Sequence, residues 1–159
     1  MRRRTDDLSP AERQLLDDVD GAGLHVVHVP ARGAVPACSF SVGLWESFQQ
    51  PEVLVLGLPH EVAGELIEVV ADEADAGQRF LDGTRHEGLL EDYPVRFVEV
   101  PKSRYAEFLA AASWAYEGAD FPAVQLVWPD KQGRWPWDPE ARAGFAASQP
   151  VLGRAGHAS

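Results

Sequence analysis

The chain has 159 residues, of which 45% are hydrophobic and 25% are charged, as is ordinary for one globular domain. The formal net charge is −11 at pH 7, which argues against the basic face that a phosphate backbone needs, so we expect no nucleic-acid partner. No apolar run reaches the roughly 20 residues of a membrane helix, and the N-terminus lacks the apolar part of a signal peptide. Cys38 is the only cysteine, which excludes an intrachain disulfide and fits a reducing compartment. We therefore expect a cytoplasmic location and no membrane partner.

The first part of the chain predicts one helix followed by three strands. Residues 1–8 include three arginines and are expected to be a flexible start. Ser9, Pro10 and Glu12 form a helix-start signature, and this helix should end at Gly21 or Gly23. The segments that follow read as strands separated by turns: 24–29, 37–45 and 51–58. The last of them is apolar almost throughout, as in a central strand buried on both faces.

The second part of the chain predicts two long helices and two strands. The elements are expected at these positions: a helix over 60–76, a loop over 78–94, a strand over 95–100, a helix from 103 to 118 and a strand over 123–128. The first of these helices carries apolar residues on one side and acidic residues on the other, which is typical of a helix with one solvated face. The remaining segment is rich in alanine, glycine and polar residues and predicts a short helix and a frayed tail.

This order of elements predicts an α+β fold. Residues 9–139 are expected to form a single domain, with 140–159 as a C-terminal tail. Strands grouped before alternating helices favour a mixed, largely antiparallel sheet. We expect the two long helices to pack mainly on one face of it, with the N-terminal helix in addition.

No known catalytic motif occurs in the chain, so the candidate site has to be assembled from single residues. GxGxxG, a Walker loop, HExxH, CxxC and GxSxG are all absent. His25 and His28 lie three residues apart on one strand and point to opposite faces, so we expect no shared metal ion and no cofactor. His60 starts a helix directly after a buried strand, where sites often form, although helix capping explains it equally well.

The stretch QLVWPDKQGRWPWDP, residues 125–139, contains three of the five tryptophans. Trp128 ends a strand and is best interpreted as a lid on the core. For Trp135 and Trp137 two interpretations stay open, a structural lid or the wall of a ligand site. Asp130 begins a type I turn over DKQG and is also placed to orient a ligand.

Four segments, GLHVVHVP, FSVGLWESFQQPEVLVLGLP, GLLEDYPVRFVEV and VQLVWPDKQGRWPWDP, together resemble the DUF4262 family, a bacterial family of unknown function. The resemblance covers roughly residues 20–139 and implies no activity. Family members often carry Tyr-Thr ahead of VGL and a histidine before the Pro-Glu pair. Phe40-Ser41 and Gln50 occupy those places here, which argues against any mechanism that needs that tyrosine or histidine.

The first functional hypothesis is a small-molecule-binding domain, with enzymatic activity left open and no metal required. Its pocket would lie between the 41–48 segment, the His60 turn and the 128–138 loop. The expected catalytic groups are Ser41, Glu46 and His60, and the expected ligand contacts are Trp45, Trp135, Trp137, Asp130 and His25. The alternative is a protein-interaction or homo-oligomerising module that uses the tryptophan-rich loop. A third hypothesis is a metal-dependent hydrolase that uses His25 or His28 with acidic residues.

Overall fold

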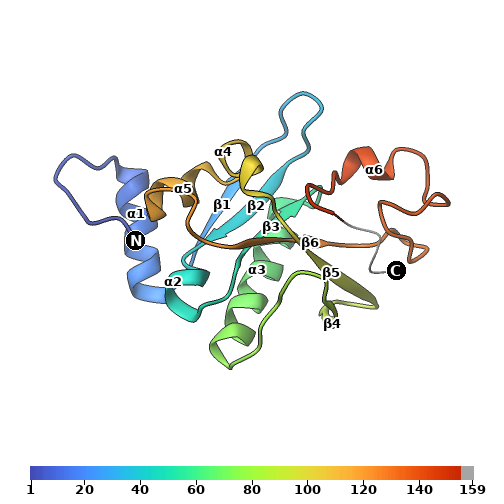
Figure 1. Ribbon diagram of the computed structural model, residues 1–159, viewed down its shortest axis with the longest axis horizontal. Helices are drawn as coiled ribbons and strands as arrows, with labels where there is room; N and C mark the ends of the chain where they lie inside the picture. Colours follow the sequence, from blue (N-terminus) through green and yellow to red (C-terminus); the bar gives the residue numbers. More distant parts are fainter. Residues whose placement is uncertain (155–159) are drawn as a thin grey trace.

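A six-stranded sheet forms the centre of the computed structural model, which describes residues 1–154 (Figure 1). The strands are β1 (His25–Val29), β2 (Cys38–Val42), β3 (Glu52–Leu56), β4 (Arg85–Leu90), β5 (Tyr93–Glu99) and β6 (Ala123–Val127). Their order across the sheet is β1-β2-β3-β6-β5-β4. The central neighbours β3 and β6 are parallel, and the other neighbours pair antiparallel. The expected α+β class and the mixed, largely antiparallel sheet are confirmed.

Helices cover both faces of this sheet. They are α1 (Pro10–Ala22), α2 (Leu44–Phe48), α3 (His60–Asp75), α4 (Tyr105–Phe108), α5 (Ala110–Tyr116) and α6 (Phe145–Ser148), with a 3₁₀ turn, η1 (Lys102–Arg104). Figure 1 shows α3 on one side of the strands and α4 and α5 on the other. Within residues 1–154, no helix combines the length and the apolar character needed to span a bilayer.

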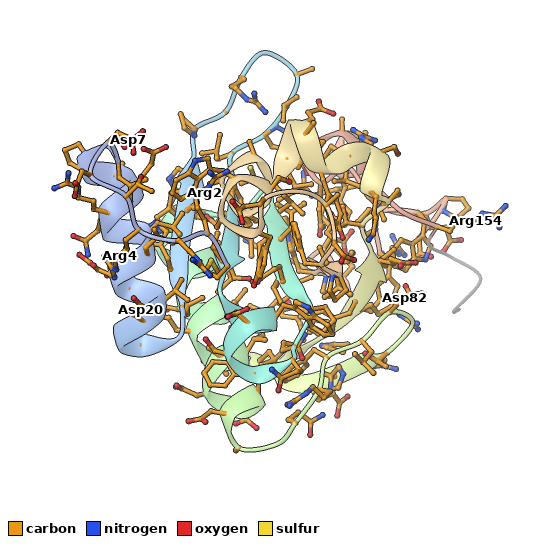
Figure 2. All side chains as sticks on the ribbon, turned by 60° about the vertical axis from the view of Figure 1, so that its left-hand side comes forward. Arg2, Arg4, Asp7, Asp20, Asp82 and Arg154 are labelled. Atoms are coloured by element: carbon orange, nitrogen blue, oxygen red, sulfur yellow. The ribbon has the colours of Figure 1, made fainter. Side chains whose placement is uncertain are left out.

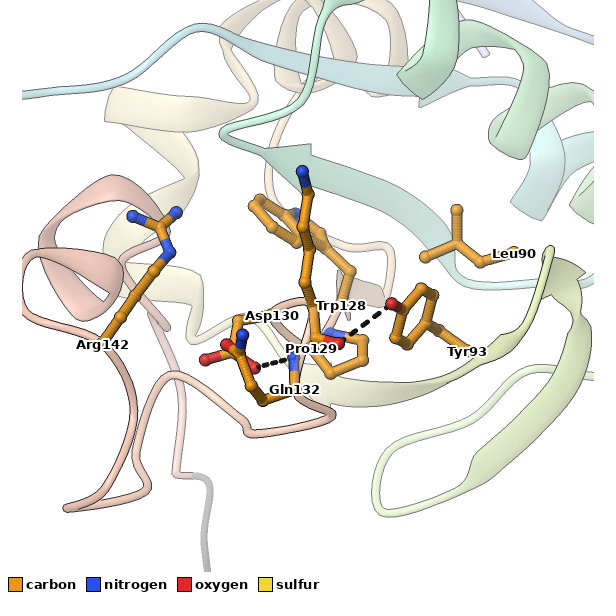
Figure 3. Close-up of a pocket in the computed structure, with 8 residues that line it drawn as sticks. Leu90, Tyr93, Trp128, Pro129, Asp130, Gln132 and Arg142 are labelled. Atoms are coloured by element: carbon orange, nitrogen blue, oxygen red, sulfur yellow. Dashed lines mark hydrogen bonds between the residues drawn. The ribbon is translucent and has the colours of Figure 1, made fainter.

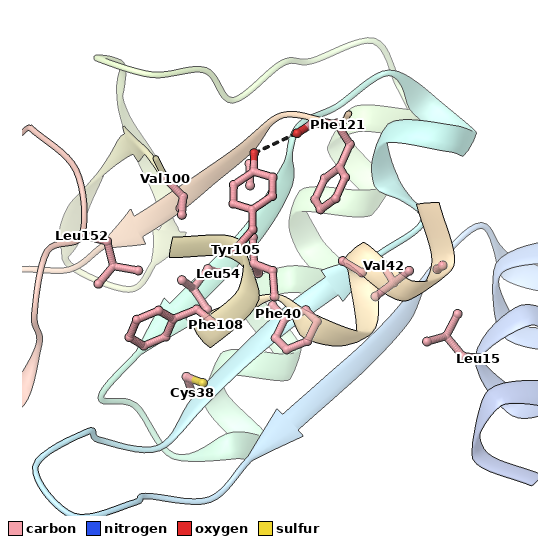
Figure 4. Packing of buried hydrophobic residues seen from close by; sticks show 14 of the residues in the cluster. Leu15, Cys38, Phe40, Val42, Leu54, Val100, Tyr105, Phe108, Phe121 and Leu152 are labelled. Atoms are coloured by element: carbon pink, nitrogen blue, oxygen red, sulfur yellow. Dashed lines mark hydrogen bonds between the residues drawn. The ribbon is translucent and has the colours of Figure 1, made fainter. Parts of the chain in front are cut away.

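The two faces carry separate hydrophobic cores. On β3, Leu54 and Leu56 pack with α1, α4 and α5, whereas Val53 and Val55 pack with α3. In the first core, Tyr105 lies beside Phe121 and donates a hydrogen bond to its carbonyl oxygen at 2.8 Å (Figure 4). Because alternate residues of a strand point to opposite faces, an apolar β3 needs cover on both sides. The long helices are therefore divided between the faces rather than packed mainly on one.

The N-terminal residues lie against the folded chain. The backbone N–H of Arg2 donates to the carbonyl oxygen of Ala115, and its side chain lies over the Trp114 ring. Arg4 pairs with Asp20 at 2.7 Å, and Figure 2 shows the two side chains beside α1. The capping box of α1 forms as expected, between Ser9 and Glu12.

Three local features differ from the sequence-based expectation. Residues 85–90, expected within a loop, form the edge strand β4, in which a register shift between His86 and Leu90 interrupts the pairing. The expected strand over 37–45 ends at Val42, because Gly43 adopts φ 113° and the chain turns into α2. The expected helix from 103 to 118 is broken at Leu109, whose φ and ψ of −129° and 37° are not helical.

The segment after residue 139 packs against the sheet as far as Leu152. α6 is the short helix expected there, and Phe145 is fully buried. The Gln149 side-chain amide donates to the backbone carbonyl oxygen of Trp128 at 2.8 Å and accepts from the backbone N–H of Trp128 at 3.0 Å. The Leu152 N–H donates to the Gln125 side-chain oxygen at 3.0 Å. The expected frayed tail thus includes a packed part, while residues 155–159 lie outside the described residues.

We predict that Gly57→Ala destabilises the protein more than Gly133→Ala. Both glycines have positive φ, 86° and 80°, so alanine adds about 1 kcal/mol of backbone strain at either position. At Gly57 the new methyl group would also lie 2.4 Å from the carbonyl oxygen of Ser148, whereas at Gly133 it meets nothing within 4 Å. We expect a loss of about 3 kcal/mol for Gly57→Ala, because steric overlap adds to the strain. Urea unfolding of both variants measures the difference. Equal losses of stability would show that the C-terminal segment around Ser148 moves away from the new methyl group at no cost.

Candidate functional site

A cleft of about 520 Å³ opens at the carboxyl end of β6, beside the β4–β5 hairpin (Figure 3). Its apolar wall includes Leu90, Tyr93 and Trp128, and its polar groups include Asp130, Lys131 and Arg142. Because β3 and β6 are parallel, their carboxyl ends meet at this edge of the sheet. In open α/β sheets the carboxyl ends of parallel strands are where ligands bind, so the position favours a site.

Hydrogen bonds from neighbouring elements fix the wall of the cleft. Trp128 follows β6, and its indole N–H donates to the carbonyl oxygen of Leu56 at 2.9 Å. The ring meets Phe145 edge-on at a centroid distance of 5.2 Å. From β5, the Tyr93 hydroxyl donates to the carbonyl oxygen of Lys131 at 3.0 Å and holds the loop after Trp128 (Figure 3).

Asp130 is the buried polar residue of the cleft, with a relative exposure of 4%. Its Oδ1 accepts hydrogen bonds from the N–H groups of Gln132 and Arg134, both at 2.9 Å, which closes the turn expected from DKQG. The N–H groups of Arg134, Gln132 and Arg142 favour the carboxylate and lower the pKa of Asp130. Oδ2 is buried and makes no well-aligned hydrogen bond within the described residues, and the backbone N–H of Arg142 is the further group that favours the carboxylate. Because the carboxylate has little exposed surface, Asp130 serves to hold the loop that lines the cleft.

Trp135 and Trp137 lie in the same loop but do not line the cleft. Their rings stack at 5.6 Å with an interplanar angle of 8°, and the guanidinium of Arg96 lies 5.2 Å from the Trp135 ring centre. The Trp135 N–H donates to Asp138 at 2.7 Å. Other side chains of the protein therefore cover much of the surface of these two rings.

Ser41, Trp45 and Glu46 lie at the opposite end of the sheet from this cleft. Strands β2 and β3 are antiparallel, so the end of β2 lies beside the start of β3, whereas the His60 turn follows the end of β3. The structure therefore does not bring the 41–48 segment together with the His60 turn and the 128–138 loop. Ser41 is fully buried, while Trp45 is 36% exposed.

Glu52, which the sequence reasoning missed, accepts five hydrogen bonds at the start of β3. The donors are the hydroxyls of Ser41 and Tyr116 and the N–H groups of Gly43, Leu44 and Trp45. The side chain is fully buried; burial raises the pKa of Glu52, and the hydrogen bonds oppose that rise. Because protein donors surround the carboxylate, it is suited to holding the fold and not to acid–base chemistry. The sequence did contain a signal for this residue: a glutamate directly after Pro51, at the start of an otherwise apolar strand.

The histidines do not gather at one site. His60 contacts the carbonyl oxygen of Val29 at 3.0 Å and stacks on His28 at a centroid distance of 4.9 Å. His25 contacts Asp18 at 2.7 Å, in a second cleft that it shares with acidic residues of α3. Within residues 1–154, no three His, Cys, Asp or Glu side chains are grouped so as to hold a metal ion.

Comparison with known protein families identifies the family of this chain. The family described as "Domain of unknown function (DUF4262)" matches residues 18–142, a range that includes Glu52 and the whole cleft. No curated protein and no solved structure matches the chain.

We predict that Glu52→Gln lowers the free energy of unfolding by about 3 kcal/mol, because the amide would place N–H groups against backbone N–H donors. Tyr116→Phe should cost about 1.5 kcal/mol, since it removes one hydrogen bond to a carboxylate. Glu46→Gln, at an exposed carboxylate of α2, is the matched control and should change stability by less than about 0.5 kcal/mol. Chemical denaturation monitored by circular dichroism measures all three. An unchanged midpoint for Glu52→Gln would contradict the role of this carboxylate.

We also predict a pH effect from His28. Burial, together with His60 and His25, lowers the pKa of His28 below its ordinary value near 6.5, so the unfolded chain binds this proton first as the pH falls. Stability should therefore decrease from pH 7.5 towards 5.5, and His28→Gln should reduce the slope. Burial also lowers the pKa of His86, so His28→Gln/His86→Gln should have the smallest slope. Urea titrations at four pH values measure this, and identical slopes in all variants would refute it.

Proposed function

We propose that this chain, which belongs to the DUF4262 family of domains of unknown function, is a small-molecule-binding domain whose ligand lies in the cleft at the carboxyl end of β6. One observation carries the proposal: a cleft of about 520 Å³ lies at the carboxyl ends of the parallel strands β3 and β6, with an apolar wall beside the polar side chains of Lys131 and Arg142. Ligand pockets typically combine such a wall with a few placed polar groups.

The proposed site keeps Asp130 from the sequence-based hypothesis and adds Leu90, Tyr93, Trp128 and Arg142. The other expected residues lie outside this cleft, and no catalytic group is assigned to it. The proposal also includes a cytoplasmic location. Its support is the cysteine content of the chain: the single cysteine, Cys38, is a free and buried thiol, as is common in reducing compartments.

A second candidate function is a protein-interaction or homo-oligomerising module. The observation that favours it is Trp45 on α2, which is 36% exposed, rather than the tryptophan-rich loop that the sequence favours. Trp135 and Trp137 are half-buried and stack on each other. Tryptophan is enriched at the centres of protein interfaces.

We predict that a pool of small metabolites raises the melting temperature of the wild-type protein and that Leu90→Trp removes this shift. A larger side chain at Leu90 fills the cleft from β4. A ligand at 100 times its Kd adds about 2.7 kcal/mol, which is several degrees for a domain of this size. Leu81→Trp is the matched control, because Leu81 is 47% exposed and does not line the cleft.

Circular dichroism is the suitable readout for this comparison, because both variants add a tryptophan and change the intrinsic fluorescence. A shift that persists in Leu90→Trp would move the ligand out of the cleft. No shift with any pool, together with a dimer in sedimentation velocity, would favour the second candidate function.

A further inference from the structure

The C-terminal segment, residues 145–152, docks on the sheet much as a separate peptide would. It lies beyond residue 142, where the range that matches the family ends. In the part of the chain that the structure describes, no backbone–backbone hydrogen bond joins this segment to a strand. Its buried anchors are Phe145 and Leu152, and Figure 4 shows Leu152 within the first core. Side chains therefore hold the segment, and strand pairing does not.

A buried glutamine of β6 pairs with the backbone of this segment. Gln125 is fully buried, and its side-chain amide donates to the carbonyl oxygen of Pro150 at 2.8 Å and accepts from the N–H of Leu152 at 3.0 Å. An amide has a donor side and an acceptor side, like a peptide group, so it matches an extended chain. Without the segment, Gln125 would lose both hydrogen bonds, which destabilises a protein interior. The surface around Gln125 therefore needs an extended peptide as its cover.

Two more positions fit this surface closely to the segment. Gln149 of the segment pairs with both backbone polar groups of Trp128. A Cβ atom at Gly57 would lie 2.4 Å from the carbonyl oxygen of Ser148, so a glycine lets the two backbones approach. We call Gln125, Trp128 and Gly57 the docking surface. It contacts groups of the segment that a second copy of the chain provides equally well.

One tight turn carries the chain back onto the docking surface. The Phe145 N–H donates to the carbonyl oxygen of Arg142 at 3.1 Å, and Gly144 between them has φ 85° and ψ −7°. These angles are those of the third residue in a type II turn, a position that needs positive φ. Residues 142–144 are exposed, and a Cβ atom at Gly144 would meet nothing within 4 Å. Backbone conformation at Gly144, and not packing around it, therefore sets the direction of the segment.

We infer that two copies of this chain exchange residues 145–152, so that each segment docks on the other copy. Opening the turn extends the chain, and every contact of the docked segment is then made between copies. Because the closed and exchanged forms share those contacts, the conformation of the short turn decides between them. In the exchanged dimer, Phe145 and Gln149 of one copy hold Trp128 of the other. The wall of each cleft then depends on both copies.

The test is refolding of the full chain from urea at high protein concentration, followed by sedimentation velocity. Gly144→Pro should shift the equilibrium towards the dimer about tenfold or more relative to wild type, because proline fixes φ at about −65° and cannot form the closed turn. Gly33→Pro is the matched control. Gly33 also has a positive φ, 56°, and open space around it, but it lies between β1 and β2. This control should leave the ratio of monomer to dimer unchanged.

Two further measurements distinguish segment exchange from other kinds of dimer. A synthetic peptide with the sequence of residues 143–154 should convert the Gly144→Pro dimer to monomer, because it occupies the same docking surface. Adding Gln125→Met to Gly144→Pro should reduce the dimer about tenfold, since methionine keeps the volume but not the two hydrogen bonds. Gln50→Met is the matched control, because the Gln50 amide pairs in the same way with the backbone of Phe80.

Circular dichroism shows whether each variant is folded. If Gly144→Pro does not fold, deletion of Ala143 replaces it, because it shortens the same turn without a proline. If neither variant folds, the wild-type chain refolded at high concentration and mixed with the peptide gives the answer.

Three results would overturn the inference: only monomer in every folded chain, as much dimer in Gly33→Pro as in Gly144→Pro, or a dimer that the peptide does not disperse. A dimer that resists the peptide but disappears in Trp45→Ala would assign the contact to the second candidate function instead.

Discussion

The buried carboxylate of Glu52 is the interaction on which the centre of the fold depends. It joins the start of β3 to the end of β2 through Ser41, to the first N–H groups of α2, and to the end of α5 through Tyr116. The first N–H groups of a helix have no partner within the helix. A carboxylate at that position accepts their hydrogen bonds and interacts favourably with the positive end of the helix dipole. One side chain thus connects four elements, β2, β3, α2 and α5, at this end of the sheet.

Buried glutamines extend the same principle to segments without regular structure. Gln50 donates to and accepts from the backbone of Phe80, and Gln149 does the same with Trp128. Gln125 links β6 to Pro150 and Leu152 in the same way. A primary amide has the donor and acceptor of a peptide group, so each side chain satisfies buried backbone as a neighbouring strand would. Trp128 is held in this way, and the C-terminal segment therefore supports the wall of the cleft.

The two ends of the sheet therefore differ in structure. At the start of β3, the polar side chain of Glu52 is satisfied within the protein, which favours stability. At the end of β6, the carboxylate of Asp130 closes a turn through the N–H groups of Gln132 and Arg134, and the exposed Lys131 and Arg142 line the cleft beside it. Hydrogen bonds within the protein close the first end, whereas the second keeps a cleft of the size that small ligands occupy.

The sequence by itself determined the elements whose residues repeat with a clear period or carry a terminal signature: α1 with Ser9 and Glu12, the buried run of β3, and the amphipathic α3. It also located the turn at Asp130. The edge strand β4 escaped prediction because a strand with one exposed side needs few apolar residues, and no proline or glycine marks the break at Leu109. Tertiary structure alone decided which segments meet. The antiparallel register of β2 and β3 separates Ser41 from His60, and the packing of residues far apart in the chain forms the cleft around Asp130. Local patterns report what each residue prefers, whereas a site depends on pairing between distant segments, which no local preference contains.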